Sequence, residues 1–173
     1  MPLGCKISGV ADTLPLRSTP WFHPEAVVFL SSLLKSDWTI FETGSGGSTI
    51  WFSSRVKKVI SVEHSKRWYD KVKKVIRNKR IKNIDLQLNP DYPKTGIQDF
   101  KEDEFDFVSI DGIRRSRVKC IKTAIPFLKS GGYLLLDDSE VIFYEEAVVL
   151  LHSWESKIFG NNHLHATTIW RKP

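Results

Sequence analysis

Residues 39–49 read Thr-Ile-Phe-Glu-Thr-Gly-Ser-Gly-Gly-Ser-Thr, an apolar run that ends in an acid and passes into a glycine-rich turn. The pattern predicts a buried strand, a loop around Gly44 and Gly46, and a helix that begins near Ser48. Glycine is needed where the backbone takes a positive φ or where a ligand approaches the main chain closely. The unpaired N–H groups at the start of the helix can bind a polar ligand. We therefore expect a ligand site at the carboxyl end of this strand.

A second acidic residue, Glu63, ends the next predicted strand, after the apolar run at 59–62. An acid in this position can accept hydrogen bonds from both hydroxyls of a ribose. The two features together predict a cofactor that contains a nucleoside. A nicotinamide-type fingerprint needs a third glycine where Thr49 stands, and a phosphate-binding P-loop needs a Gly-Lys pair, which the chain lacks. An oxidoreductase and a P-loop nucleotide-binding protein are therefore disfavoured.

The string Glu-Thr-Gly-Ser-Gly-Gly-Ser-Thr at 42–49, followed by Glu63, resembles motif I and the next acidic position of class I S-adenosylmethionine-dependent methyltransferases. Ser48 stands where that family frequently has a third glycine. With Val-Glu-His-Ser-x-x-Trp-Tyr at 62–69, the string also looks like a group of small bacterial-type methyltransferases. The resemblance implies S-adenosylmethionine as cofactor, with its amino-acid end at the loop and its ribose at Glu63. The cofactor-binding residues that it implies are Glu42, Thr43, Gly44, Ser45, Gly46, Ser48, Thr49, Glu63, His64, Asn89 and Asp111.

The order of predicted elements favours an α/β, Rossmann-like fold. Strands alternating with helices imply right-handed parallel crossovers and a doubly wound, mostly parallel sheet with helices on both faces. Residues 157–171 predict a C-terminal antiparallel hairpin. Residues 1–20 contain several prolines and glycines and predict an irregular N-terminal arm before a single domain at 21–173. Strands are expected at 38–42, 59–63, 84–88, 105–111 and 133–137. Helices are expected at 24–34, 48–54, 115–128 and 141–156, and a basic helix is expected after the second strand, to about residue 79.

Three carboxylates follow the fourth and fifth predicted strands, namely Asp111 and the pair Asp137-Asp138. The carboxyl ends of parallel strands share one rim of the sheet, so we expect these side chains to lie together. Oxygen ligands suit Mg²⁺ or another hard divalent cation. The arrangement resembles catechol and caffeoyl-CoA O-methyltransferases, which place an Asp and an Asp-Asn pair around such an ion; here Asp138 replaces the amide. Without a metal, Arg114 and Arg115 would neutralise the pair.

The resemblance implies direct methyl transfer, and an oxygen of a small molecule or glycan is the acceptor that we expect. If no metal takes part, the candidate general bases are Asp111, Asp138 and His64. Of these, His64 directly follows Glu63 and is expected nearer to the cofactor than to the acceptor. No large recognition insertion is visible, so we expect acceptor contacts from the N-terminal arm and the short loops, and His23 could close the site from that side.

The positive charge of the chain is concentrated in one region. The net charge is +6, yet residues 55–82 contain twelve Lys or Arg against Glu63 and Asp70, a local charge of +10. Such a region can bind nucleic acid. Alternatively, it is the solvated side of an amphipathic helix, because apolar residues recur there at helical spacing. Two other functions therefore stay open: an RNA-binding methyltransferase or accessory protein, and a catalytically silent interaction protein with a methyltransferase fold.

Length and composition are those of a single globular domain, with 173 residues, of which 41% are hydrophobic and 27% charged. No apolar run approaches the roughly 18 residues of a membrane span, so no membrane partner is expected. The N-terminus lacks a basic-then-apolar signal peptide. Cys5 and Cys120 share no metal-ligand spacing, and Cys120 falls on a predicted apolar helix face. The simplest expected location is the reducing cytoplasm.

Overall fold

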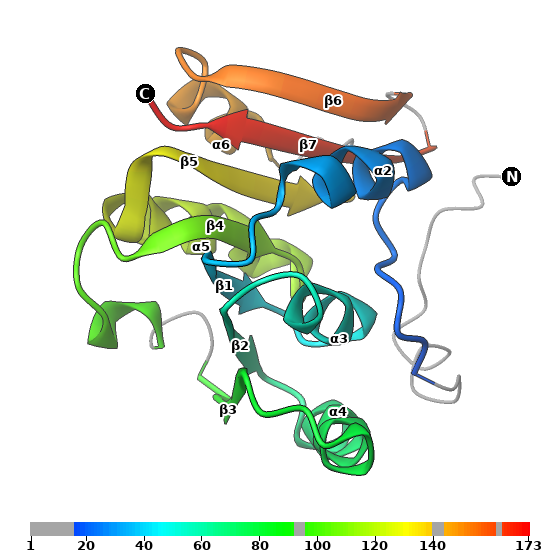
Figure 1. Ribbon diagram of the computed structural model, residues 1–173. Helices are drawn as coiled ribbons and strands as arrows, with labels where there is room; N and C mark the ends of the chain where they lie inside the picture. The colour runs from blue at the N-terminus through cyan, green and yellow to red at the C-terminus, as the bar shows by residue number, and fades with distance from the viewer. Residues whose placement is uncertain (1–15, 92–95, 140–143, 162–163) are drawn as a thin grey trace, which may run out of the picture.

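The computed structural model describes residues 16–91, 96–139, 144–161 and 164–173. The first strands run parallel: β1 (Thr39–Thr43), β2 (Lys58–Glu63), β3 (Ile84–Leu88), β4 (Phe105–Ile110) and β5 (Leu128–Asp137). They are followed by an antiparallel hairpin of β6 (Glu155–Asn161) and β7 (Leu164–Arg171), in which β7 also pairs with β5. All lie in one sheet, in the order β3-β2-β1-β4-β5-β7-β6 (Figure 1). This confirms the predicted mostly parallel sheet and its hairpin.

Helices cover both faces of the sheet, as predicted. One side carries α2 (Pro24–Leu33), α3 (Gly47–Ser53) and α4 (Lys66–Lys79), and the other carries α5 (Arg117–Ala124) and α6 (Glu145–Leu150) (Figure 1). Pro24 stands in the first turn of α2, where its missing N–H costs no helical hydrogen bond. The Ser65 hydroxyl caps α4 by accepting from the N–H of Trp68 at 3.3 Å. Within the described ranges, no helix combines the length and the apolar character that crossing a membrane requires.

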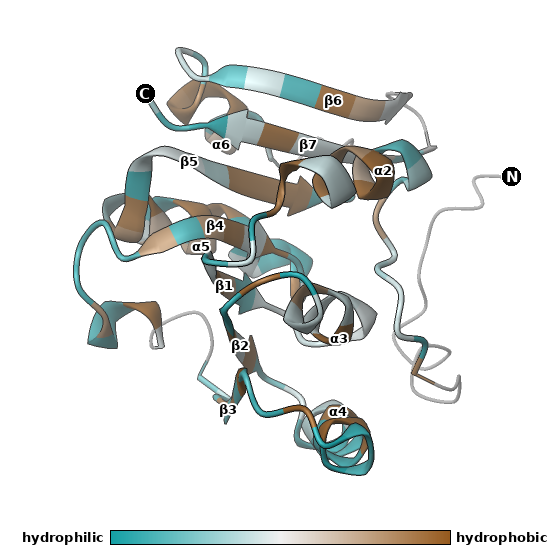
Figure 2. Ribbon diagram, in the orientation of Figure 1, coloured by the Kyte–Doolittle hydropathy of each residue, from teal (hydrophilic) through white to brown (hydrophobic). Residues whose placement is uncertain are grey.

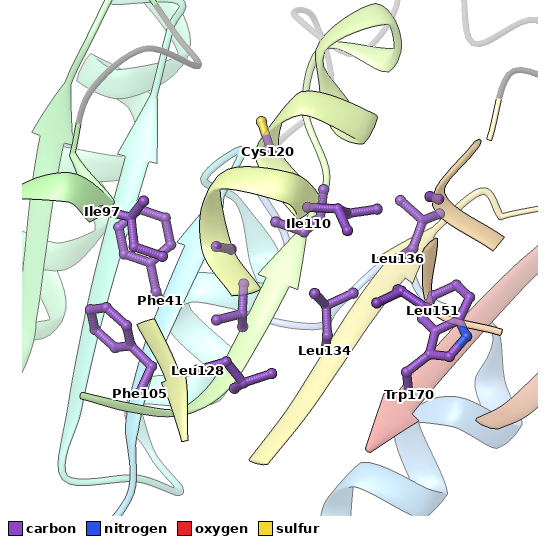
Figure 3. Packing of buried hydrophobic residues seen from close by; sticks show 14 of the residues in the cluster. Phe41, Ile97, Phe105, Ile110, Cys120, Leu128, Leu134, Leu136, Leu151 and Trp170 are labelled. Atoms are coloured by element: carbon purple, nitrogen blue, oxygen red, sulfur yellow. The ribbon is translucent and has the colours of Figure 1, made fainter. Parts of the chain in front are cut away.

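Apolar side chains of the inner strands divide between two hydrophobic clusters, one on each face of the sheet. In β1, Ile40 enters the cluster beneath α2 and α3, whereas Phe41 enters the cluster that α5 and α6 cover. Figure 3 shows the second cluster, in which Phe41 and Trp170 are at opposite ends and Cys120 lies on α5, as its helix position predicted. Burying one large apolar side chain contributes about 1.5–3 kcal/mol. The two clusters therefore hold the strand ends, and the side chains that follow them, in fixed positions.

The chain reverses direction across the sheet between β1 and β4. From β1 it moves outward through β2 to β3, and it then returns to place β4 on the other side of β1. In an open α/β sheet, ligands bind beyond the carboxyl ends of the strands at such a switch point. The region just after Thr43 and Ile110 is therefore the expected site.

Three predicted elements differ from the structure. Gly131 and Gly132 do not cap a helix but lie inside β5, where Gly131 N donates to Lys172 O at 2.9 Å and Lys172 N donates to Gly132 O at 2.8 Å. The helix expected at 115–128 is divided, because α5 ends at Ala124 and a 3-10 turn, Ile125–Phe127, contains Pro126. The helix expected at 141–156 is shorter, since α6 ends at Leu150 and β6 pairs with β7 from Glu155; residues 140–143 lie outside the described ranges.

Candidate active site

The glycine loop, residues 44–47, joins β1 to α3. Gly44 has a φ of 82°, and a Cβ there would lie 2.6 Å from the backbone N of Gly112, so only glycine fits between this loop and the chain after β4. Gly46 is extended, and a Cβ there would meet nothing nearer than Trp68 Nε1 at 4.0 Å. The first glycine is thus required by packing, and the second leaves space beside the backbone for a ligand.

Glu42 lies beneath the glycine loop with 1% of its surface exposed. Its carboxylate accepts hydrogen bonds from the hydroxyls of Ser48, Thr49 (2.5 Å) and Ser61 (2.7 Å). Thr49 Oγ1 also accepts from the Gly46 N–H at 2.8 Å. Burial raises the pKa of Glu42 to about 7, although the three hydroxyls act to lower it. Glu42 therefore holds the loop and the start of α3 in shape from below.

Glu63 connects the end of β2 to the same loop. Its carboxylate accepts from Ser45 N at 2.9 Å and Ser65 N at 2.8 Å, and its Oε1 lies 3.0 Å from His64 Nδ1. The hydrogen bond to Glu63 raises the pKa of His64 against the opposing effect of burial. A carboxylate has about four acceptor positions, so one remains for a ligand hydroxyl. A second ribose hydroxyl would displace one of the present donors.

Trp68, which was not a predicted cofactor residue, and the predicted residues Thr43, Asn89 and Asp111 lie around this loop. Trp68 donates its indole N–H to the Ser45 carbonyl and fixes the first turn of α4 against it. Thr43 Oγ1 lies 3.3 Å from both the backbone N and the backbone O of Asp111, which ties the ends of β1 and β4 together. Asn89 follows β3, and its N–H donates to the Glu63 carbonyl at 2.8 Å. These contacts bring the predicted cofactor residues to one end of the sheet.

Asp111, Asp137 and Asp138 share the rim after β4 and β5, as predicted, and a buried arginine lies among them. Arg117 is 3% exposed, and its guanidinium is 2.6 Å from Asp111 Oδ1 and 3.6 Å from Asp138 Oδ2, while Nη1 donates to the Asp137 carbonyl at 2.5 Å. The predicted Arg114 is farther away, 3.8 Å from Asp138 Oδ2. The positive charge on the rim thus comes chiefly from Arg117.

The sequence carries a signal for Arg117, which was not among the predicted site residues. Arg117 shares its spacing with Cys120, Ile121 and Ala124, and all four are buried on one face of α5. A charged residue on the apolar face of an amphipathic helix needs a buried partner of opposite charge. The expected Arg115 is exposed and stands away from this face.

Charge and burial act together around Arg117 and Tyr144. Burial opposes the charge of Arg117, but the negative groups around it, Asp111 first, hold its pKa above its ordinary value. Burial raises the pKa of Tyr144, whose ring centroid lies 5.9 Å from the Arg117 guanidinium carbon. Within the ranges that the structure describes, Arg117 Nε and Tyr144 Oη are buried without a hydrogen-bond partner. Such groups normally bind water or a ligand.

The predicted metal ligands do not assemble in the expected form. Candidate ligand atoms of Asp137, Asp138 and His165 lie within 4.8 Å of one another, and Asp111 is not a member of this group. The Asp111 carboxylate instead binds Arg117, whose charge is also near Asp138. Within the described residues, Asp111 is therefore not grouped with the other two predicted ligands, whereas Asp137 and Asp138 form a possible ligand group with His165.

The remaining candidate base, His64, is on the cofactor side. Two strands, β1 and β4, separate β2 from β5 in the sheet. Three inter-strand spacings amount to about 14 Å, so the structure does not bring His64 together with Asp138. Asp111 and Asp138 lie on the same rim, and their side chains are 30% and 5% exposed, respectively. Asp111 is the more accessible of the two.

A family model described as a methyltransferase domain matches residues 41–139, more than half of the chain and the stretch from β1 to the end of β5. Comparison with curated protein sequences gave no significant match.

Several solved structures share the fold. An rRNA methylase from Streptococcus thermophilus has a TM-score of 0.66 and 15% identity, with 84% of this chain and 92% of that chain covered. A precorrin-6y C5,15-methyltransferase from Geobacter metallireducens has a TM-score of 0.67 and 17% identity, with 86% and 87% covered. A Streptococcus mutans protein described as a methyltransferase, in complex with S-adenosylhomocysteine, has a TM-score of 0.65 and 18% identity, with 84% and 94% covered. At these identities the likeness shows the fold alone.

Proposed function

The chain belongs to the methyltransferase-domain family of S-adenosylmethionine-dependent enzymes, and from this we propose that it methylates an oxygen of a small molecule or glycan. The observation that supports an oxygen acceptor is the rim of Asp111, Asp138 and Arg117 beside the glycine loop. A carboxylate there can accept the proton of a hydroxyl. The guanidinium can orient a second oxygen of the same acceptor.

The cofactor residues fit S-adenosylmethionine. The open space beside Gly46 is next to the glycine loop, and Glu63 keeps an acceptor position for a ribose hydroxyl. When bound, the cofactor supplies a methyl group that its sulfonium already activates. The task left to the protein is to align the acceptor oxygen, and positioning of this kind contributes a large part of the rate.

We assign Asp111 the contact with the acceptor hydroxyl, because its side chain is the more exposed of the two rim candidates. Arg117 holds the Asp111 carboxylate at 2.6 Å and so fixes its direction. A divalent ion has no part in this proposal, because the same guanidinium supplies the positive charge near Asp111 and Asp138.

Nucleic acid is a second candidate acceptor, and the charge of residues 55–82 favours it. Most Lys and Arg side chains of this region are exposed, and α4 is mostly hydrophilic in Figure 2. Lys71 lies 4.7 Å from the ring centroid of the half-buried Trp68. Basic side chains beside aromatic rings suit a single-stranded nucleic acid. One of the proteins of similar fold is an rRNA methylase.

Methyl transfer from labelled S-adenosylmethionine separates these candidates. The purified protein is incubated with a panel of hydroxyl compounds, including catechols and oligosaccharides, and separately with total RNA. We expect label in a hydroxyl compound and a loss of at least about hundredfold in Asp111→Asn, the order of a missing general base. Label in RNA would replace the first candidate by the second. Cofactor binding without label in either panel would favour a silent interaction protein.

A further inference from the structure

The described part of the N-terminal arm lies directly against the glycine loop. We call residues 17–23 the strap. A Cβ on Gly47 would lie 2.1 Å from the carbonyl oxygen of Thr19 and 2.7 Å from that of Arg17. Figure 1 shows this segment in dark blue, beside α3 and leading up to α2. The strap backbone can approach so closely only because residue 47 has no side chain.

The carboxyl end of the strap is anchored to Asp137 through a buried threonine of β7. The N–H of His23 donates to Thr167 Oγ1 at 2.9 Å, and the same hydroxyl donates to Asp137 Oδ1 at 3.0 Å. Thr167 and Asp137 are both 0% exposed. A buried hydroxyl that accepts one hydrogen bond and donates another links the strap rigidly to the rim.

A second anchor joins the strap to Asp138 through a histidine. His165 Nε2 donates to the Trp21 carbonyl, and His165 Nδ1 lies 3.1 Å from Asp138 Oδ1. Both residues have left-handed backbone conformations, with φ of 52° for His165 and 49° for Asp138. Non-glycine residues rarely adopt this conformation, and where they do the surrounding contacts hold them there.

The two ends of the strap lie on either side of the strand end that carries Asp111. Gly47 follows β1, the anchors reach the end of β5, and β4 lies between β1 and β5 in the sheet. The strap therefore connects the cofactor loop to the residues that hold the rim carboxylates Asp137 and Asp138.

We propose that the strap forms one wall of the methyl-acceptor site, and that His165 and Thr167 are positioning residues that act through Asp138 and Asp137. This inference rests on the proposed function. In it, the anchors hold the strap over the site, and they fix the two carboxylates relative to Asp111. The strap also links the two halves of the site, so cofactor binding at the glycine loop stabilises the acceptor wall.

Hydrogen exchange of the strap amides tests the anchors, with two neighbouring variants as a matched pair. Thr167→Val removes the hydroxyl that joins His23 to Asp137. Thr168→Val, the control, removes a hydroxyl on the same strand that lies 2.7 Å from Ser139 Oγ, a residue outside the strap. In the cofactor-free protein, we expect strap exchange to be about five- to tenfold faster in Thr167→Val, which corresponds to one lost hydrogen bond. The control should exchange like the wild type.

His165→Asn tests the second anchor without removing a buried group. The His165 side chain is 37% exposed, and asparagine tolerates its left-handed backbone but is too short to span both Trp21 and Asp138. We expect faster strap exchange with little change in the unfolding midpoint. A purely structural role would move the midpoint and leave strap exchange unchanged relative to the rest of the chain.

Binding of S-adenosylhomocysteine tests whether the strap takes part in the function of the site. At saturation it should slow strap exchange in the wild type, and its affinity should fall about fivefold in Thr167→Val but not in Thr168→Val, again the scale of one hydrogen bond. Equal rates of strap exchange in the two threonine variants would contradict the anchoring role of Thr167. If S-adenosylhomocysteine slowed hydrogen exchange in the glycine loop but not in the strap, the strap would not be part of the site. Failure of S-adenosylhomocysteine to bind would reject the proposed function, and with it the wall, while the exchange of the cofactor-free variants would still decide the anchors.

Discussion

At the scale of single residues, Glu42 is the most unusual group in the fold. It is buried, bonded to three hydroxyls, and has a pKa raised from 4.5 to about 7. A raised pKa means that the folded state disfavours the ionised form. The stability associated with Glu42 is therefore fully present below about pH 4.5 and is lost as the pH rises through about 7.

Glu42→Gln should remove this pH dependence, because glutamine does not ionise. Between pH 5 and pH 8 we expect the wild type to lose roughly 2–3 kcal/mol more unfolding free energy than the variant loses. Denaturant unfolding at a series of pH values measures both curves. Parallel pH profiles would show that Glu42 is ionised throughout and that burial does not control its charge.

Arg117 provides a second prediction at this scale. Its positive charge is balanced by the charges of Asp111, Asp138 and Asp137, of which Asp137 and Asp138 are buried. Arg117→Leu should destabilise the protein by about 3–5 kcal/mol, since it leaves buried charges without compensation. The exposed Arg115 is a matched control, and Arg115→Leu should change stability by less than about 0.5 kcal/mol. Equal effects in denaturant unfolding would contradict the role of Arg117 in neutralising the rim.

At the scale of elements, helix α4 carries most of the positive charge of the basic region 55–82. Lys73→Glu, Lys74→Glu and Arg77→Glu together reverse three exposed cations of this helix. If the second candidate acceptor is correct, the affinity for a single-stranded RNA should fall at least about tenfold, and the slope of log affinity against log salt should decrease by about two. The control triple, Lys35→Glu, Lys101→Glu and Lys119→Glu, makes the same charge change at exposed positions elsewhere. Equal losses of RNA affinity in the two triple variants would show that the region 55–82 is a solvated surface and not an RNA-binding site.

The accuracy of prediction differs among elements for physical reasons. β3 and α4 were predicted at Ile84–Leu88 and to Lys79, because their apolar spacing and flanking breakers depend on local sequence. The Gly131-Gly132 pair was misassigned, because its place in β5 depends on pairing with residues about forty positions later. The same applies to residues 155–156, whose strand forms only when β7 is alongside. Local patterns gave the elements, and long-range pairing decided where several of them end.

The residues of the candidate site also differ in whether they could be predicted from the sequence. The glycine loop and Glu63 could be predicted, because each follows a strand directly in the sequence. His165 and Thr167 could not be assigned their contacts, because their partners Trp21 and His23 lie 144 positions away in the sequence. Only the folded sheet brings these residues together.

At the scale of the whole molecule, the fold, the family and the site agree on one cofactor. The sheet order places the switch point between β1 and β4, the glycine loop and Glu63 lie there, and the methyltransferase-domain match covers the same stretch. Substrate identity depends on fewer residues, those of the rim and the strap. The proposed function therefore depends first on the claim that S-adenosylmethionine binds at the glycine loop and Glu63.

Calorimetric titration with S-adenosylhomocysteine tests that claim most directly, on the wild type, Glu63→Ala and the control Asp70→Ala. Asp70 is an exposed acid of α4 that pairs with Lys66 and does not touch the glycine loop. We expect micromolar binding by the wild type and by the control, and binding weaker by about hundredfold in Glu63→Ala, because hydrogen bonds to a charged acceptor are lost. No binding to the wild type, or equal binding to Glu63→Ala, would contradict the account.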